Sequence, residues 1–255
     1  MALTLHQLRR RASTLILAAT AAAFAAGCSQ VELDPTEGWD ADRLYSEARA
    51  AAEDSDWTRA QDYYTKLESR YPFGRYAQQA QIESAYAYWR DGEAEQCVQA
   101  CDRFLRQYPN HANSDYVLYL KALATLNQRD TIFTAILTQD IYERDADAAQ
   151  TAFDTFKELV ERFPNSRYAH ESRRRMHELV LSQAHRELSI AQFYYDRHAY
   201  VAAIERAQNV VRTYQQTPYS DDALKLIKDC YDQLGVKDLE GDVNRVIELN
   251  QNRER

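Results

Sequence analysis

The residues of this chain best suited to redox or metal chemistry are the cysteines Cys97 and Cys101. They lie four residues apart, which on a helix is one turn. A disulfide between them therefore remains possible in an oxidising compartment. A metal site would need a third and a fourth ligand at suitable spacing, and the sequence supplies none. Both cysteines occupy positions that recur elsewhere in the chain as apolar residues. We therefore expect buried thiols that pack like small apolar side chains.

Other catalytic chemistry has no support in the sequence. The six histidines are scattered, and none stands with a serine or cysteine in a nucleophile motif. The six glycines are too dispersed to form a phosphate-binding loop, and no metal-binding loop rich in aspartate occurs. We predict a protein that is not an enzyme and that uses neither a metal nor a cofactor.

The N-terminus has the features of an export signal. Arg9, Arg10 and Arg11 precede an apolar run from Thr14 to Phe24, which is too short to span a bilayer. The run ends in Ala25-Ala26-Gly27-Cys28, which resembles a bacterial lipobox, although leucine is usual where Ala25 stands. The resemblance implies that residues 1–27 are removed and that Cys28 is acylated. The alternative is an ordinary signal cleaved after an alanine, which would leave a soluble protein.

Charge then limits the partners of the mature chain. The whole sequence has 31 basic and 39 acidic residues, and loss of the three arginines leaves 28 against 39, a net charge of −11. This argues against nucleic acid and against electrostatic adhesion to anionic lipids. We expect membrane attachment through acyl chains, with residues 28–40 as the acylated cysteine and a polar tether.

A pattern of apolar residues at offsets 0, 4, 7 and 11 recurs four times and places each set on one side of a helix. Proline follows the first three stretches at once, whereas in the fourth Gln215-Gln216 stands where proline is expected and the proline comes only at Pro218, so we expect a looser turn there. The stretches are Ala60–Tyr71, Cys97–Tyr108, Ala152–Phe163 and Ala203–Tyr214. Recurring helices with their own stop signal predict an all-α, tetratricopeptide-like solenoid of about five helical hairpins.

The organisation follows from this pattern. Small residues recur twelve positions apart, at Ala48 and Ala60, Ala85 and Cys97, and Ala191 and Ala203, where two helices would cross closely. We expect N-terminal repeats over 41–182, about three in number, and C-terminal repeats over 183–255, about two in number. An insertion at 127–147 contains apolar residues, and either packs over the neighbouring groove or contacts a partner. One extended helix, or two abutting ones, should cover Arg167 to Arg197, and the last hairpin should pair 220–234 with 238–250.

A candidate peptide-binding surface follows from the repeat register. The first helix of each hairpin lines the inner side of such a stack, which gathers aromatic residues there. Tyrosine and tryptophan offer large contact areas with a polar tip and suit an extended peptide with aromatic side chains. The simpler alternative is that several of them only pack between hairpins. The inner positions are Tyr45, Ile82, Tyr86, Trp89, Tyr116 and Tyr119, with Phe73 at an edge.

The C-terminal half has a second candidate surface, for a partner protein. Tyr194, Arg197 and Arg206 belong to a concentration of aromatic and guanidinium groups in a mostly acidic chain. Arg206 lies three residues after Ala203, so we expect it to leave the core face and to be free for a carboxylate on another chain. Surface decoration is the alternative.

With its lipobox, number of hairpins and insertion taken together, the chain resembles the BamD-type (competence-lipoprotein-like) outer-membrane protein assembly factors, which are tetratricopeptide-repeat lipoproteins. The most particular stretches are Arg70–Gln79, Asp115–Tyr119, Phe163–Tyr168 and Ala191–Arg206. The resemblance implies a scaffold of the machine that folds β-barrels into the outer membrane.

The same resemblance implies the location and the partners. Ser29 after the cysteine favours transfer to the outer membrane, with the protein on the periplasmic face of its inner leaflet. The implied partners are the barrel-forming subunit through its periplasmic domains, companion lipoproteins, and unfolded outer-membrane proteins. N-terminal repeats would face substrate and C-terminal repeats the barrel subunit. The competing hypothesis is another periplasmic repeat scaffold, for example in cell-wall synthesis or DNA uptake.

Overall fold

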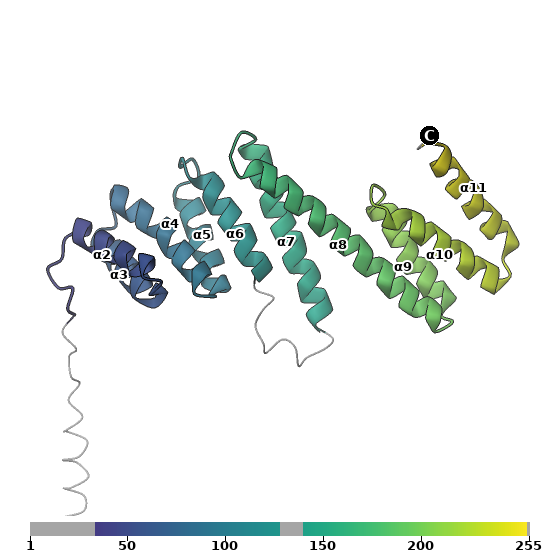
Figure 1. Cartoon of the computed structure of the whole chain (residues 1–255), viewed down its shortest axis with the longest axis horizontal. Helices are drawn as coiled ribbons and strands as arrows, with labels where there is room; N and C mark the ends of the chain where they lie inside the picture. Colours follow the sequence, from purple (N-terminus) through teal and green to yellow (C-terminus); the bar gives the residue numbers. More distant parts are fainter. Residues whose placement is uncertain (1–33, 128–139, 254–255) are drawn as a thin grey trace, which may run out of the picture. The chain divides into compact units, whose positions relative to one another are not determined.

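The computed structural model describes residues 34–127 and 140–253, and over these residues the chain is helical, without a strand (Figure 1). The all-α prediction is confirmed. The helices are α2 (Ala41–Glu53), α3 (Trp57–Arg70), α4 (Arg75–Arg90), α5 (Ala94–Gln107), α6 (Ser114–Asn127), α7 (Asp140–Arg162), α8 (Ala169–Asp196), α9 (Tyr200–Thr213), α10 (Tyr219–Leu234) and α11 (Lys237–Arg253).

The residues up to Asp40 form a unit of their own, of which 34–40 are described. They make a turn in which the Asp34 carboxylate accepts hydrogen bonds from the backbone N–H of Thr36 at 3.0 Å and from its hydroxyl at 2.8 Å. This turn is the described end of the predicted tether. The predicted signal peptide and Cys28 lie outside the described residues.

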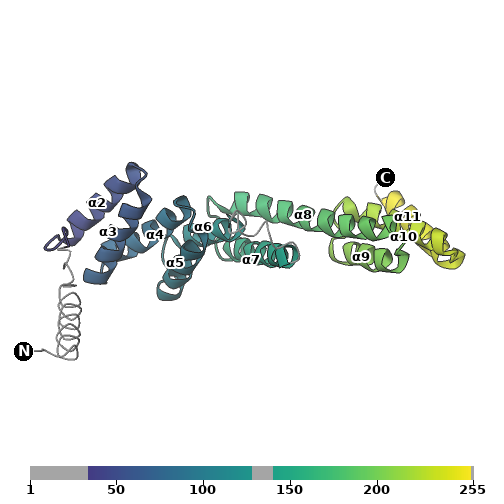
Figure 2. The same ribbon diagram turned by 90° about the horizontal axis from the view of Figure 1, so that it is seen from below.

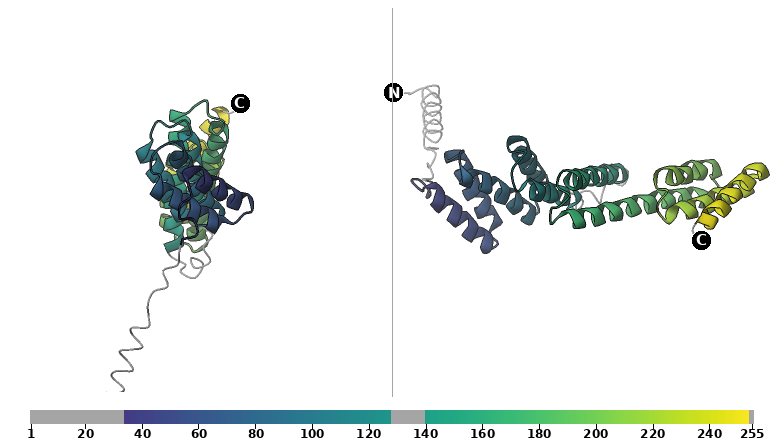
Figure 3. Two further views of the ribbon diagram at one scale, coloured as in Figure 1. Left: turned by 90° about the vertical axis from the view of Figure 1, so that its left-hand side faces the viewer. Right: turned by 90° about the horizontal axis from the view of Figure 1, so that it is seen from above.

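From Ala41 on, neighbouring helices pack as antiparallel hairpins. The pairs are α2 with α3, α4 with α5, α6 with α7, α8 with α9, and α10 with α11, as the views from different sides also show (Figures 2 and 3). Each hairpin contacts the next through the second helix of one and the first helix of the other. The predicted number of hairpins therefore holds for the described residues.

The small residues of the repeat lie where paired helices meet. Ala48 and Ala60 are 0% exposed, and Ala85 and Cys97 are 1% and 0% exposed. Ala191 and Ala203 on α8 and α9 are 0% exposed as well. Because a larger side chain at these points would push the two backbones apart, the spacing of twelve residues reports a real packing constraint.

The last residue of each apolar stretch ends its helix. Tyr71, Tyr108 and Tyr214 are C-cap residues of α3, α5 and α9, and each donates its backbone N–H to the carbonyl four residues before. The next residue is proline after Tyr71 and Tyr108, which disfavours helical geometry at the preceding residue. Tyr214 ends its helix in the same way without that proline.

The second helix of the third hairpin begins earlier than predicted. We expected it to start near residue 147, but α7 starts at Asp140. Its first residues, DIYERDADAA, include the good helix formers Glu, Arg and Ala, so local propensity favours an earlier start. The predicted insertion is accordingly shorter at its end, and its residues 128–139 lie outside the described residues.

Helix α8 is one continuous helix of 28 residues, which is the first of the two forms expected for this region. Its N-terminal end packs on α7, where Ala169 joins Leu159 and Val160. Its C-terminal half packs on α9, where Ala191 joins Ala203. One helix thus serves two hairpins in succession, and the predicted repeat boundary between residues 182 and 183 falls in its middle.

Candidate functional site

A hollow of about 540 Å³ lies between α4 and α6, the first helices of the second and third hairpins. Its remaining side is formed by the turn between α7 and α8. We call it the α4–α6 groove. Residues of α4 are Gln79, Ile82, Glu83 and Tyr86; Ala112, Asn113, Asp115 and Tyr116 come from α6 and the segment before it, and Arg167 and Tyr168 from the turn.

Tyr86 is held in place by aromatic and cationic neighbours. Its ring lies 6.0 Å from that of Trp57 and 5.8 Å from that of Trp89, measured between centroids. The Arg90 guanidinium lies over both the Trp57 and Tyr86 rings, and Nη1 donates a hydrogen bond of 2.7 Å to the Tyr86 hydroxyl. Trp89 does not line the groove but supports the ring that does.

Glu83 connects the groove to the first hairpin. One carboxylate oxygen accepts hydrogen bonds from the Tyr45 hydroxyl at 2.7 Å and from the Gln79 amide at 2.8 Å. The other accepts from the Tyr64 hydroxyl at 2.6 Å. These donors come from α2, α4 and α3, so a single carboxylate fixes three helices beside the groove.

The same contacts affect the pKa values of Tyr45 and Tyr64. Burial, followed by the hydrogen bond to the Glu83 carboxylate, raises the pKa of Tyr45 and of Tyr64 well above its ordinary value. Both phenols are therefore held neutral as donors. Tyr45 acts on the groove through Glu83 and is not one of its lining residues.

Tyr116 and Tyr119 belong to an aromatic group at the other side of the groove. The Tyr168 ring stacks on Tyr119 at a centroid distance of 4.8 Å and lies 5.6 Å from Tyr116. Tyr119 also lies 6.1 Å from the buried Phe156 of α7. Burial raises the pKa of Tyr116, which keeps its hydroxyl protonated. Tyr116 thus presents a neutral phenol to the groove, and Tyr119 supports Tyr168.

Charged groups complete this side of the groove. The Arg167 guanidinium lies 4.7 Å from the centroid of the Tyr168 ring and donates a hydrogen bond to the Tyr168 hydroxyl. Asp115 accepts a hydrogen bond of 2.5 Å from the Ser166 hydroxyl, which ties the start of α6 to the turn before α8. Because Arg167 is itself exposed, its cation faces water as well as the groove.

Phe73, predicted at an edge of the surface, lies in the turn between α3 and α4 and is 91% exposed. Gly74 follows it with a φ of +107°, a conformation that L residues rarely adopt. A phenylalanine ring so open to water is the kind of side chain that a partner would cover. The structure does not bring it into the α4–α6 groove.

The C-terminal candidates form a separate surface on α8 and α9. Tyr194 meets Phe193 edge-on at 5.8 Å and packs on the core between α8, α9 and α10. The Arg197 guanidinium lies 3.5 Å from the centroid of the Phe193 ring. Arg197 and Phe193 are exposed, whereas Tyr194 is half-buried.

One expectation about this surface needs correction. Arg206 leaves the core face as predicted, and its side chain is 48% exposed, but it is not free. Its Nη1 lies 3.4 Å from a carboxylate oxygen of Glu187 on α8. The sequence did not reveal this pair because Glu187 lies across the hairpin, at a place fixed by how α8 and α9 pack.

The three cysteines that are described are free and buried. A hydrogen bond with Cys97, together with burial, raises the pKa of Cys101, and burial raises the pKa of Cys230 to about 11. Because the thiolate is the reactive form, Cys101 and Cys230 are unreactive packing residues, and Cys97 is buried at 0% exposure. The expectation of buried thiols is confirmed for Cys97 and Cys101.

The structure thus unites part of the predicted inner surface and adds to it. Tyr86 and Tyr116 line one groove with Ile82, whereas Tyr45, Trp89 and Tyr119 support it from behind. Sequence reasoning missed Glu83, Asp115, Arg167 and Tyr168 as groove residues. Tyr168 had a signal, since it belongs to the stretch Phe163–Tyr168 that the family resemblance singles out.

Among the described residues, no group of three or more His, Cys, Asp or Glu side chains could hold a metal ion. Nor does any of the helices described combine the length and apolar character needed to cross a membrane.

Comparison with known proteins identifies relatives. Residues 38–246 match the family model YfiO, described as "Outer membrane lipoprotein". The chain is 40% identical over 215 residues to the outer membrane protein assembly factor BamD of Neisseria meningitidis serogroup A, covering 84% of this chain and 80% of that protein.

Two relatives from other bacteria carry the same name. The factor from Xylella fastidiosa Temecula1 is 35% identical over 226 residues, which are 88% of this chain and 77% of that protein. The factor from Vibrio cholerae O1 is 35% identical over 208 residues, which are 82% and 86% of the two chains.

Proposed function

The chain belongs to the outer membrane lipoprotein family, and from this premise we propose that it is a non-catalytic scaffold of outer membrane protein assembly that binds unfolded substrate in the α4–α6 groove. The named relatives, all outer membrane protein assembly factors, support the general role. The groove supports the specific one, because its chemistry suits a polypeptide better than a small reactant.

The observation that carries this proposal is the pairing of aromatic rings with neutral polar groups in one open hollow. Tyr86, Tyr116 and Tyr168 offer faces on which aromatic side chains can pack. Gln79 and Asn113 offer amides that can bond to an extended backbone. A segment of an unfolded β-barrel protein offers both aromatic side chains and free backbone groups along its length.

The other contacts that we propose divide the chain between partners. The acyl chains on Cys28 would hold the protein at the inner leaflet of the outer membrane, facing the periplasm. The surface around Tyr194, Arg197 and Arg206 would dock the barrel-forming subunit through its periplasmic domains, with companion lipoproteins nearby. Arg206 would first have to release Glu187, or bind a partner while still paired to it.

The test replaces the native protein in depleted cells with variants and measures the amount of β-barrel proteins in the outer membrane. Tyr86→Ala should lower that amount several-fold, because the groove loses an aromatic face. Tyr88→Ala is the matched control, since Tyr88, like Tyr86, is half-buried on α4 and packs on the same core, but does not line the groove. Equal effects of both variants would contradict the groove as substrate site. Unchanged barrel levels on depletion would contradict the assembly role.

A further inference from the structure

A second hollow, of about 500 Å³, lies at the middle of α8, and neither the substrate role nor the C-terminal surface uses it. We call it the α8 hollow. The C-terminal end of α9 and the turn after it form its other side. Its lining comprises Phe153 of α7, Met176, His177 and Val180 of α8, and residues 212–217, which are Arg212, Thr213, Tyr214, Gln215, Gln216 and Thr217.

The hollow exists because α8 is twice the length of an ordinary repeat helix. Helix α4, with 16 residues, packs on α3 before it and on its own partner α5. Helix α8 has 28 residues, with the contacts to α7 at its N-terminal end and those to α9 in its C-terminal half. The middle of α8 is left open between the two.

The lining has an unusual chemistry for this chain. Phe153, Met176 and Val180 supply apolar surface, and Arg212 and His177 are the ionisable groups of basic type. No Asp or Glu is among the described residues that line it, although the chain has 39 acidic residues. Arg212 is exposed and makes no ion pair with any residue that the structure describes.

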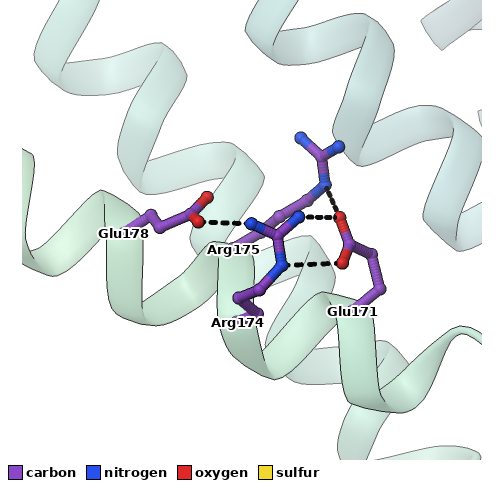
Figure 4. A network of polar contacts seen from close by, with 4 residues as sticks. All are labelled: Glu171, Arg174, Arg175 and Glu178. Carbon is purple, nitrogen blue, oxygen red and sulfur yellow. Dashed lines mark hydrogen bonds and ion pairs between the residues drawn. The ribbon is translucent and has the colours of Figure 1, made fainter.

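Three other cations of α8 and α9, by contrast, are paired within the chain. Arg174 is bonded to Glu171 and Glu178, and Arg175 to Glu171, in a network along the exposed side of α8 (Figure 4). Arg206 is paired with Glu187. The guanidinium of Arg212 thus has no ion pair among the described residues and lies in a hollow lined by apolar side chains.

We propose that the α8 hollow is a docking site for an acidic segment of a partner protein, with apolar side chains beside its carboxylates. The apolar residues would enter between Phe153, Met176 and Val180, and a carboxylate would pair with Arg212. A second copy of this chain is a poor occupant, because its net charge is −8 as translated and −11 after loss of Arg9, Arg10 and Arg11. The inference does not depend on what the α4–α6 groove binds.

The test places a photo-crosslinking benzophenone amino acid at Gln216 of the full chain in its native bacterium and sequences the captured peptide. Asn110 is the matched control position, because it lies two residues after Tyr108 as Gln216 lies two residues after Tyr214. We expect Gln216 to capture a segment with carboxylates next to apolar residues, and Asn110 not to capture it. Arg212→Glu should lower the yield roughly tenfold, as a charge pair becomes a like-charge contact.

Arg106→Glu controls for net charge, since Arg106 lies nine residues after Cys97 as Arg212 lies nine after Ala203. Arg106→Glu should leave the crosslinking yield unchanged. Replacing an acidic residue of the captured segment by arginine should restore the yield that Arg212→Glu lowers. Any of four results would overturn the proposal. These are a crosslinked product with a second copy of this chain, capture of a neutral or basic segment, no crosslinked product, and an equal loss of yield with Arg106→Glu. The amount of β-barrel proteins in the outer membrane of the same cells tests the assembly role separately.

Discussion

At the scale of single residues, the Glu83 carboxylate is the main polar connection between the first hairpin and the groove. Its three donors, Tyr45, Tyr64 and Gln79, lie on three helices. Hydrogen bonds to a charged acceptor are stronger than neutral ones, and an acceptor that loses its donor in a partly buried place is destabilised. The stability of the first two hairpins should therefore depend on each donor.

We predict that Tyr64→Phe lowers the free energy of unfolding by about 1.5–3 kcal/mol, the range for a hydrogen bond to a charged group. Tyr64 is 1% exposed, and its hydroxyl is the donor at 2.6 Å to one of the two oxygens of Glu83. Phenylalanine keeps the ring and removes only that donor. Urea unfolding followed by circular dichroism gives the difference.

Tyr88→Phe provides the control, because no hydrogen bond of the Tyr88 hydroxyl is found among the described residues and its ring packs on the core. It should change the free energy of unfolding by less than about 0.5 kcal/mol, as is usual where no buried partner is lost. Equal effects of the two substitutions would show that the Glu83 contact does not stabilise the fold.

Residue positions in the groove were predictable only along a helix. Tyr86 and Tyr116 follow from the repeat register, because one helical face must line the inner side of the stack. Arg167 and Tyr168 belong to a turn, which the hydrogen bond from Ser166 to Asp115 ties to α6. That contact spans 51 residues and has no periodic signal in the sequence.

At the scale of elements, three turns share one hydrogen-bond pattern. In the turn from α5 to α6 the amide of His111 bonds to the carbonyl of Tyr108, and the amide of Ser114 to that of His111. The turn from α7 to α8 repeats this with Phe163, Ser166 and Ala169, and the turn from α9 to α10 with Tyr214, Thr217 and Ser220. The hydrogen bonds of the turn at Gln215 therefore show no loosening relative to the other two turns.

This identity of turns predicts that Gln215→Pro stabilises the protein. Proline occupies the corresponding positions 109 and 164, and the φ of Tyr214, −120°, is close to the −133° of Tyr108 before Pro109. The substitution restricts the unfolded chain at a site where the folded backbone already fits. We expect a gain of about 0.4–1 kcal/mol in the free energy of unfolding.

Chemical denaturation of the two proteins measures this gain. Gln216→Pro is the useful contrast, because it moves proline one position along the turn, where the other two turns carry Asn110 and Asn165. It should give no gain or a loss. Destabilisation by Gln215→Pro would mean that the Gln215 backbone differs from that of the other turns.

Helix boundaries were predictable where a stop signal accompanies the apolar pattern. α3 ends at Arg70, directly before Tyr71, the last residue of the predicted stretch Ala60–Tyr71. The start of α7 was missed because the residues before 147 break the pattern, although their helical propensity still favours a helix. α11 likewise continues to Arg253, past the predicted end at residue 250. The apolar pattern identifies buried faces and does not by itself fix where a helix begins or ends.

At the scale of the whole molecule, charge decides how the protein can reach a membrane. The chain without residues 1–27 carries 28 basic and 39 acidic residues, so anionic headgroups repel it on balance. Acyl chains contribute about 0.8 kcal/mol for each buried CH₂ group and can outweigh this repulsion. A single acylation site would therefore control the location of the whole protein.

The substitution Cys28→Ser tests this directly. The signal region remains, so export should continue, but serine lacks the thiol that accepts the lipid, and the protein should move from the outer membrane fraction to the soluble periplasmic fraction. Helix content by circular dichroism should not change after purification, because residues up to Asp40 form a unit apart from the hairpins. Ser29→Ala is the control and should stay with the membrane. If Cys28→Ser remained there through a high-salt and then a carbonate wash, protein contacts and not the lipid would supply the anchor, and the C-terminal surface would become the first candidate for it.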